Sequence, residues 1–401
     1  MLDPEAISVE TTAVQLVEEL HRLAQLCRMT DARPYRETEP VYSIDELNAR
    51  EALLIQLEMS LLPSLRQQLL NLLGSLDLRA LPTAPEPNFK DALEITSNLH
   101  PSIMQIKKNI ESLAPWRYLL APARNDSTHG PLKQARCDRL IENFLELVNV
   151  KIRHLIQAYL HFDSRGMFSA EDRDQVIEAT DSCVQAVDAM IRFSKKNDLD
   201  IIQEHWQKSL QSLDELLTDV TFRINFSNSL GQGRSQIDPA EYTPARPGWV
   251  PRSQLIPLKL EVVHLFELAV PLIKLARIFF RRIVITPSGK PMFSLDPRIC
   301  SLDIHKLDRR VSSFYESIEH VMEILYALND EDDEHNRRQT LGSWSCIPED
   351  RLNSCLVSLA MHIVPLPTGH DHHPTENLFK TLFFSLKSEF DELSNIFQNN
   401  I

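Results

Sequence analysis

Histidine and carboxylate side chains, the usual ligands of protein-bound transition metals, gather in one short stretch near the C-terminus. His370, His372 and His373 lie in the segment PTGHDHHPTE, which Glu376 closes, and His362 lies a short way upstream. Imidazole nitrogens and carboxylate oxygens together can bind zinc. Adjacent histidines in a proline-flanked loop rarely converge on one ion, and this segment also suits a connection that leads into a helix. We therefore favour the connecting loop and keep metal binding as the alternative.

A run of five acidic residues, Asp330 to Glu334, offers a second kind of chemistry. Clustered carboxylates can hold a divalent cation, and a helical chain of this size invites comparison with class I terpenoid synthases. Those enzymes need a further Asn/Ser/Glu constellation to hold magnesium against a diphosphate, and we find no such spacing here. The run is typical of a solvated loop between helices, and we favour that interpretation over a magnesium site.

Two Glu-x-x-His pairs have the spacing that helical di-iron proteins use, namely Glu18 with His21 and Glu261 with His264. A di-iron site needs both pairs, and two further glutamates, to face the inside of a bundle. Glu18 points away from the leucine stripe of its own helix, so this pair is expected to face solvent. The spacing is therefore interpreted as coincidence.

Nucleophilic and phosphate-binding motifs are missing from the sequence. It has no GxSxG, no HExxH and no P-loop, and its 9 glycines among 401 residues leave few positions for such turns. His205, beside Trp206, is interpreted as an interface or surface residue and not as a general base. We assign no catalytic, cofactor-binding or metal-ligating residue, and we do not expect an enzyme.

Helices must position whatever function the chain has, because apolar residues recur at alternating steps of three and four through most of it. The most regular stripe comprises Ile304, Leu307, Val311, Phe314, Ile318, Val321, Leu325 and Leu328. Similar stripes occupy residues 16–27, 99–113, 141–159, 176–190, 206–224 and 378–397. No β-sheet is evident. The sequence predicts an all-α fold, an up-and-down antiparallel bundle or two bundles end to end.

Helix ends and breaks also show in the sequence. Ser43 and Glu46 have the spacing of a capping box, Pro63 should kink the helix that follows, and Gly74 should lie near its end. Pro115 should stop the third helix, and Pro271 lies inside the long apolar helix of the second half.

The periodicity disappears between residues 229 and 252, where prolines, glycines and charges alternate without pattern. We therefore expect an N-terminal bundle at 1–228, a linker at 229–252 and a C-terminal bundle at 253–401. Tyr242 and Trp249 offer apolar surface with which the linker could dock.

The net charge, the N-terminal segment and the cysteines limit the expected binding partners and cellular location. A net charge of −14 gives no general attraction to nucleic acid, and the N-terminus is too acidic for a signal peptide. Six scattered cysteines form no CxxC pair, and Cys27 and Cys183 fall on apolar stripes, as small buried residues do. Charged residues interrupt the most apolar segment, 255–285, so no membrane span is expected. We expect an intracellular protein, cytoplasmic in preference to nuclear.

Two segments, LLPSLRQQLLNLLGSL at 61–76 and VPLIKLARIFFRRI at 270–283, resemble those of an expanded, uncharacterised group of all-helical proteins from rust fungi. At the level of multi-helix architecture the chain is also similar to cyclin-D-interacting and vinculin-like bundles, which are adaptors or scaffolds. These resemblances imply a helical fold and no activity.

The function is not identified by any motif, and the sequence favours an interaction or scaffold protein with an unknown protein partner. A metal-dependent enzyme, using the His370 cluster or the Asp330 acids, is one alternative. A carrier for an apolar ligand held around residues 265–280 is another.

Overall fold

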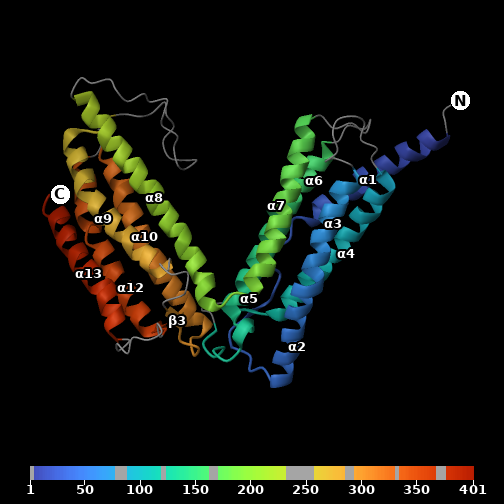
Figure 1. Ribbon diagram of the computed structural model, residues 1–401, viewed down its shortest axis with the longest axis horizontal. Coiled ribbons are helices and arrows are strands. Elements are labelled where there is room, and N and C mark those ends of the chain that lie inside the picture. Colours follow the sequence, from blue (N-terminus) through green and yellow to red (C-terminus); the bar gives the residue numbers. More distant parts are fainter. Residues whose placement is uncertain are drawn as a thin grey trace. The chain divides into compact units, whose positions relative to one another are not determined.

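The computed structural model describes residues 4–76, 88–118, 123–161, 170–231, 257–284, 293–329, 334–366 and 376–401, and most of them are helical (Figure 1). The chain forms two compact units. The first comprises Met1–Asn197 together with Cys300–Leu302, and the second comprises Asp198–Ile299 and Asp303–Ile401. The predicted all-α fold is confirmed.

Within the residues that the structure describes, the first unit contains seven α-helices. They are α1 (Pro4–Leu26), α2 (Ile44–Gln56), α3 (Leu62–Ser75), α4 (Phe89–Leu113), α5 (Gln134–Glu146), α6 (Arg153–Leu160) and α7 (Ala170–Ser194). Helix α4 packs against α1, α2 and α3, and α7 packs against α3 and α6. The stripe of Leu16, Leu20, Leu23 and Cys27 is buried, with no member more than 4% exposed.

The predicted helix signals in this unit are found where the sequence places them. The Ser43 hydroxyl accepts a hydrogen bond from the Glu46 amide at 3.2 Å, and the Glu46 carboxylate accepts one from the Ser43 amide at 2.7 Å, which completes the capping box. Helix α4 ends at Leu113, just before Pro115, and α3 ends one residue after Gly74.

The predicted disturbance near Pro63 takes the form of a wide turn. Residues Leu57–Leu61 form a π-helical turn between α2 and α3, and the amide of Leu62 donates to the carbonyl of Leu57, five residues earlier. Proline has no amide hydrogen to donate four residues back, so an α-helical ladder cannot continue unbroken through Pro63. A π turn absorbs one extra residue at the point where the ladder changes register.

The second unit contains six helices in the part of the chain that the structure describes. They are α8 (Asp198–Gly231), α9 (Leu260–Val284), α10 (Ser301–Ala327), α11 (Glu334–Trp344), α12 (Ile347–His362) and α13 (Glu376–Gln398). Helix α9 packs against α8 and α13, and α12 packs against α13. All eight residues of the predicted α10 stripe are at most 5% exposed, so this stripe is confirmed.

The boundary between the units differs from the one expected after residue 228. Helix α8 belongs to the second unit, because it packs against α9, with Trp206 and Leu213 on its buried face. The expected linker, 229–252, begins inside α8, and its residues 232–252, with Tyr242 and Trp249, lie outside the described residues. Loss of periodicity therefore marked the end of a helix and not the end of a unit.

Two short strand pairs correct the expectation of no β-sheet. In the first unit, β1 (Tyr35–Arg36) pairs in parallel with β2 (Arg117–Tyr118). In the second, β3 (Phe293–Leu295) pairs antiparallel with β4 (Ile363–Pro365). Strands of two or three residues carry too little periodic pattern to be read from sequence.

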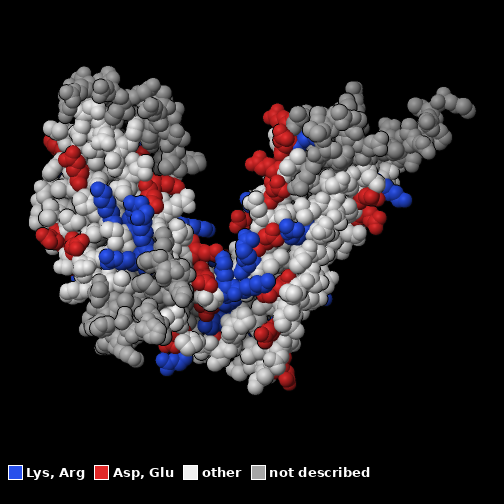
Figure 2. Space-filling view, viewed as in Figure 1, with Lys and Arg blue, Asp and Glu red and all other residues white. Residues whose placement is uncertain are grey.

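Charged side chains of both signs occur on the visible face of each unit (Figure 2). Acidic side chains gather at the start of α7, whose first turn contains Glu171 and Asp172, where they face the positive end of the helix dipole. Among the described residues, no helix is both long and apolar enough to cross a membrane.

The reactivity of the cysteine thiols tests whether the helices are packed as the structure shows. All six thiols are free, and only Cys346 is exposed. Burial raises the pKa of Cys27, Cys137 and Cys183 to about 12, and it also raises the pKa of Cys355. Since the thiolate is the reactive form, buried thiols with raised pKa values react slowly.

We expect one thiol per chain to react rapidly with a maleimide at pH 8 and the other five to react only after unfolding. Mass spectrometry of the labelled protein counts the sites, and the Cys346→Ser variant should lose the rapid one. Rapid labelling of two or more thiols in the native protein would contradict the packing described above.

Aromatic rings form the centre of the second unit. The ring of Phe314, on α10, lies 5.4 Å from that of Phe279, 6.2 Å from that of Phe280 and 5.5 Å from that of Phe390, measured between centroids. These four side chains are fully buried. The contacts therefore tie α10 to both α9 and α13.

We expect Phe314→Ala to lower the free energy of unfolding by about 3–5 kcal/mol, because it removes a buried ring and leaves a cavity among three others. Urea denaturation measures this loss. The control is Phe384→Ala, since Phe384 is 73% exposed on α13 and should change the stability little. Equal effects of the two substitutions would show that the ring cluster does not carry the stability assigned to it.

Candidate functional site: a pocket around Arg50

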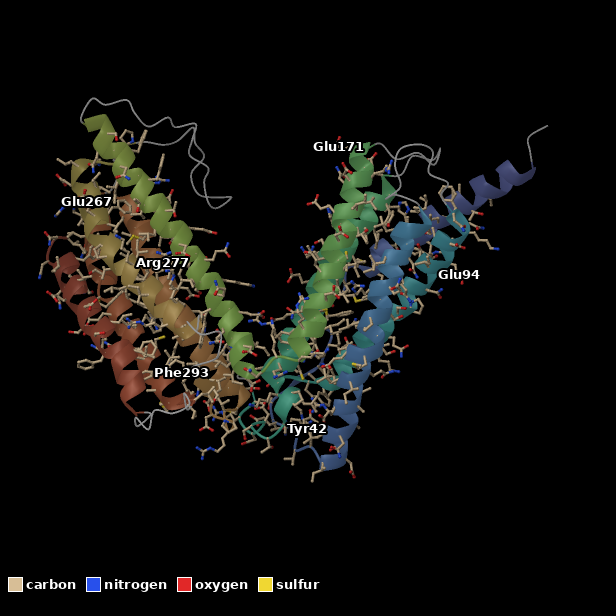
Figure 3. The ribbon with its side chains drawn as sticks, viewed as in Figure 1. Tyr42, Glu94, Glu171, Glu267, Arg277 and Phe293 are labelled. Atoms are coloured by element: carbon tan, nitrogen blue, oxygen red, sulfur yellow. The ribbon has the colours of Figure 1, made fainter. Side chains whose placement is uncertain are left out.

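A small pocket lies in the first unit where three separate parts of the chain meet. Residues from 39 to 50, from 114 to 116 and from 123 to 134 line it, and it encloses about 30 Å³. Tyr42, which Figure 3 labels, belongs to the first of these segments and lies just before α2. The space suffices for about two water-sized groups.

Arg50 is the only Lys or Arg that lines this pocket among the described residues. It lies on α2 three residues after Leu47 and four before Leu54, on the side that packs against α4, and it is 9% exposed. One amino group, Nη2, donates to the carbonyl of Leu113, the last residue of α4. The carbonyls of a final helical turn lack helical donors and carry partial negative charge, so a cation is favoured there.

The other two guanidinium nitrogens, Nε and Nη1, are buried and have no hydrogen-bond partner among the described residues. The Tyr42 ring covers one face of the guanidinium, with its centroid 4.3 Å from Cζ. The N–H bonds of a guanidinium lie in its plane, so a hydrogen-bond acceptor reaches these nitrogens from the edge of the group. Leaving a buried donor unpaired costs about 1–3 kcal/mol, and more for a charged group.

Two carboxylates line the same pocket, and each is held by donors other than Arg50. The Glu39 oxygens accept from the backbone amides of Arg124 at 2.5 Å and Asn125 at 2.9 Å. The Asp126 oxygens accept from the amides of Ser301 and Gln134, both at 2.8 Å, and from the Ser301 hydroxyl. Neither carboxylate therefore supplies the missing acceptors of Arg50.

His129 completes the polar lining. Its ring meets Tyr42 edge to face, with the centroids 5.8 Å apart. Burial lowers the pKa of His129; the nearby Asp126 charge opposes this effect, and the Arg50 charge adds to it. A lowered pKa keeps the imidazole neutral at pH 7, so Arg50 carries the positive charge of the pocket.

A second buried arginine, Arg33, shows by contrast what full pairing looks like. Its Nε and Nη2 atoms donate to Asp31 at 3.0 and 2.9 Å, and Nη1 donates to Asp138 at 2.9 Å and to the Ala114 carbonyl at 3.0 Å. Although burial acts the other way, the hydrogen bonds from Arg33 hold the pKa of Asp31 below its ordinary value. Arg33 is a structural link between the segment after α1 and the end of α4.

The two Glu-x-x-His pairs belong to different units, and both are exposed. Glu18 and His21 are exposed, and the His21 ring forms a hydrogen bond with the Val17 carbonyl of its own helix, at 2.8 Å. Glu261 is exposed and pairs with Arg338, and His264 is also exposed. Among the described residues, no group of three His, Cys, Asp or Glu side chains could hold a metal ion.

His205 contacts an acid and a hydroxyl without forming a catalytic triad. Its Nδ1 lies 2.9 and 3.0 Å from the two carboxylate oxygens of Asp308 and 3.5 Å from the hydroxyl of Ser312. In a triad the acid and the nucleophile bind opposite nitrogens of the imidazole, so that one orients the ring while the other loses its proton. Here both partners face the same nitrogen, and the arrangement links α8 to α10.

The other predicted candidates lie partly beyond what the structure describes. His370, His372 and His373 are outside the described residues, as are Asp330–Asp333 of the acidic run. Glu334 and Glu376 are the first residues of α11 and α13. His362 is the last residue of α12, and its carbonyl accepts from the Asp296 amide at 2.9 Å.

Sequence reasoning missed the pocket, although one signal was present. Arg50 interrupts a stripe of apolar residues at helical spacing, which comprises Leu47 and Leu54 of α2 and Leu57 just after it. A charged residue on a buried stripe indicates a special environment. Asp126 and His129 gave no such signal, because they lie outside any periodic segment.

Asp126 tests whether the pocket wall depends on its buried carboxylate. We expect Asp126→Ala to lower the free energy of unfolding by about 3 kcal/mol, since it leaves three donors without their acceptor. Urea denaturation is the measurement, with Glu178→Ala, an exposed acid on α7, as the control. A loss no larger than that of the control would contradict the role given to Asp126.

Comparison with known families agrees with the structural division. Residues 197–399 match the family described as a domain of unknown function (DUF8721), and residues 50–195 match another domain of unknown function (DUF8723). The two matches meet at the boundary between the two compact units. No curated protein matches the chain. Since the first match covers just over half of the sequence, the chain belongs to the DUF8721 family.

Proposed function

We propose that this chain is an interaction or scaffold protein that binds another protein through an apolar face of α12. One observation carries the proposal. Helix α12 has two apolar faces, of which the fold buries only one. Val357 and Met361 are 58% and 67% exposed, and Ala360 between them is exposed too.

The spacing of these residues is that of a contact surface. Positions 357, 360 and 361 are separated as i, i+3 and i+4, which places their apolar side chains along one side of α12. Val364, which is 43% exposed, lies in β4, the strand that follows α12 directly. Isolated exposed apolar residues are ordinary, but an unbroken row of them indicates a binding face.

The opposite face of α12 is already used by the fold. Leu352, Cys355 and Leu359 are fully buried, and α12 packs against α13. The exposed row is therefore not needed to hold α12 in place. A partner with an apolar helical face fits it best, because ridges and grooves of side chains at helical spacing interdigitate.

Other observations support an interaction protein over the alternatives. The rings of Phe279, Phe280 and Phe314 pack against one another where a carrier would hold an apolar ligand. His205, Asp308 and Ser312 lack the geometry of a triad. Six free thiols suit a reducing, cytoplasmic setting.

The test replaces two residues of the α12 row with glutamine, in a V357Q/M361Q double variant. Proteins crosslinked to the wild-type chain in an extract are identified by mass spectrometry, and the partner so found is purified and titrated by calorimetry. We expect the double variant to bind it at least about tenfold more weakly, since two interface residues together contribute more than about 1.4 kcal/mol.

The matched control is Val14→Gln, because Val14 is 55% exposed on α1, in the other unit. It should bind the partner like the wild type, and circular dichroism should show all three proteins equally helical. Undiminished binding by the double variant to every partner would overturn the proposal.

A further inference from the structure

We propose that the pocket around Arg50 is a binding site for a carboxylate group joined to an apolar body. The inference concerns the first unit and is independent of the role proposed for α12. It begins with the guanidinium, which is 9% exposed and has Nε and Nη1 unpartnered among the described residues. A buried cation in this state calls for an anion or for water.

The fold's own anions do not fill this role. Glu39 and Asp126 line the pocket, yet the amides of Arg124, Asn125, Gln134 and Ser301 hold their oxygens. Arg33, a short distance along the chain, shows that this unit can pair a buried arginine with two carboxylates. The acceptor for Arg50 must therefore come from outside the described residues.

The unpartnered donors of the pocket favour a small anion such as a carboxylate. The ring of Tyr42 covers one face of the guanidinium, and the N–H bonds of Nε and Nη1 lie in the plane of the group. These two donors point to different edges of the group, so one carboxylate oxygen accepts from one of them, and a charged acceptor forms a stronger hydrogen bond with arginine than a neutral one does. The enclosed space of about 30 Å³ holds about two water-sized groups, so it admits the small charged head of a ligand while the rest of the ligand stays at the mouth.

The mouth of the pocket offers apolar surface for the rest of the ligand. Pro40, Tyr42 and Trp116 line it, and Tyr42 and Trp116 are half-buried. Val41, between two lining residues, is 98% exposed. A carboxylate that carries an aromatic or aliphatic group would place its oxygens on Arg50 and its apolar part against these side chains. A small organic acid and the C-terminus of a peptide both have this chemistry.

Calorimetric titration of the full chain with benzoate tests the proposal, with benzamide as the uncharged analogue of the same shape. We expect saturable binding of benzoate and at least tenfold weaker binding of benzamide. Equal binding of the two, or no binding of benzoate, would overturn the proposal. Inorganic phosphate is titrated separately, and tighter binding of phosphate than of benzoate would also overturn it.

Variants place the effect on Arg50. Arg50→Gln should weaken benzoate binding at least tenfold, whereas Arg66→Gln, which alters a partly exposed arginine paired with Asp188 on the same unit, should not. Unchanged binding by Arg50→Gln would refute the site. If that variant unfolds, the comparison of benzoate with benzamide on the wild type still decides.

The peptide acetyl-Gly-Gly-Phe, as free acid and as amide, distinguishes the two sources. Tighter binding of the free acid than of benzoate supports a peptide C-terminus, and tighter binding of benzoate supports a small organic acid. Binding of the amide as tight as that of the acid would count against the carboxylate itself.

Discussion

The end of α4 is the point on which the first unit depends. A helix leaves its last carbonyls without helical donors, and Pro115 prevents the chain from continuing the ladder beyond Leu113. Two buried arginines from distant segments satisfy these groups, Arg50 at the Leu113 carbonyl and Arg33 at the Ala114 carbonyl. The chain before α2 and the chain after α4 are thereby drawn to one place, where β1 and β2 also pair.

The same constraint makes the two arginines different in kind. Arg33 reaches two carboxylates as well as the carbonyl, so its charge is neutralised within the fold. Among the described residues, Arg50 contacts the Leu113 carbonyl and the ring of Tyr42 but no carboxylate, while backbone amides donate to the acids beside it. If the only role of Arg50 were to hold the end of α4 in place, it could be paired with carboxylates in the same way as Arg33. The unpaired nitrogens of Arg50 are therefore hydrogen-bond donors that the described part of the fold does not use, and that a ligand can use.

The helices could be predicted well from the sequence, whereas the contacts between distant segments could not. The α10 stripe from Ile304 to Leu328, the capping box at Ser43 and the end of α4 before Pro115 follow from spacing within one helix, and spacing is visible in sequence. The unit boundary was missed because α8 faces α9, a contact across an aperiodic stretch. The pocket was missed because Arg50, Asp126 and His129 come from separate segments. The local sequence around a carboxylate does not show which hydrogen-bond donors the fold will bring to it.

Helix α12 carries exposed apolar residues that packing within the unit does not explain. A helix at the surface of a bundle normally carries one apolar face, because the other face gains nothing from apolar side chains in water. The buried residues Leu352 and Leu359 already anchor α12, so Val357 and Met361 do not stabilise the unit by burial. In α10, by contrast, the apolar stripe is buried throughout. Exposed apolar side chains at helical spacing contribute stability only when another molecule buries them. An apolar helical face of a second protein has the matching spacing of side chains.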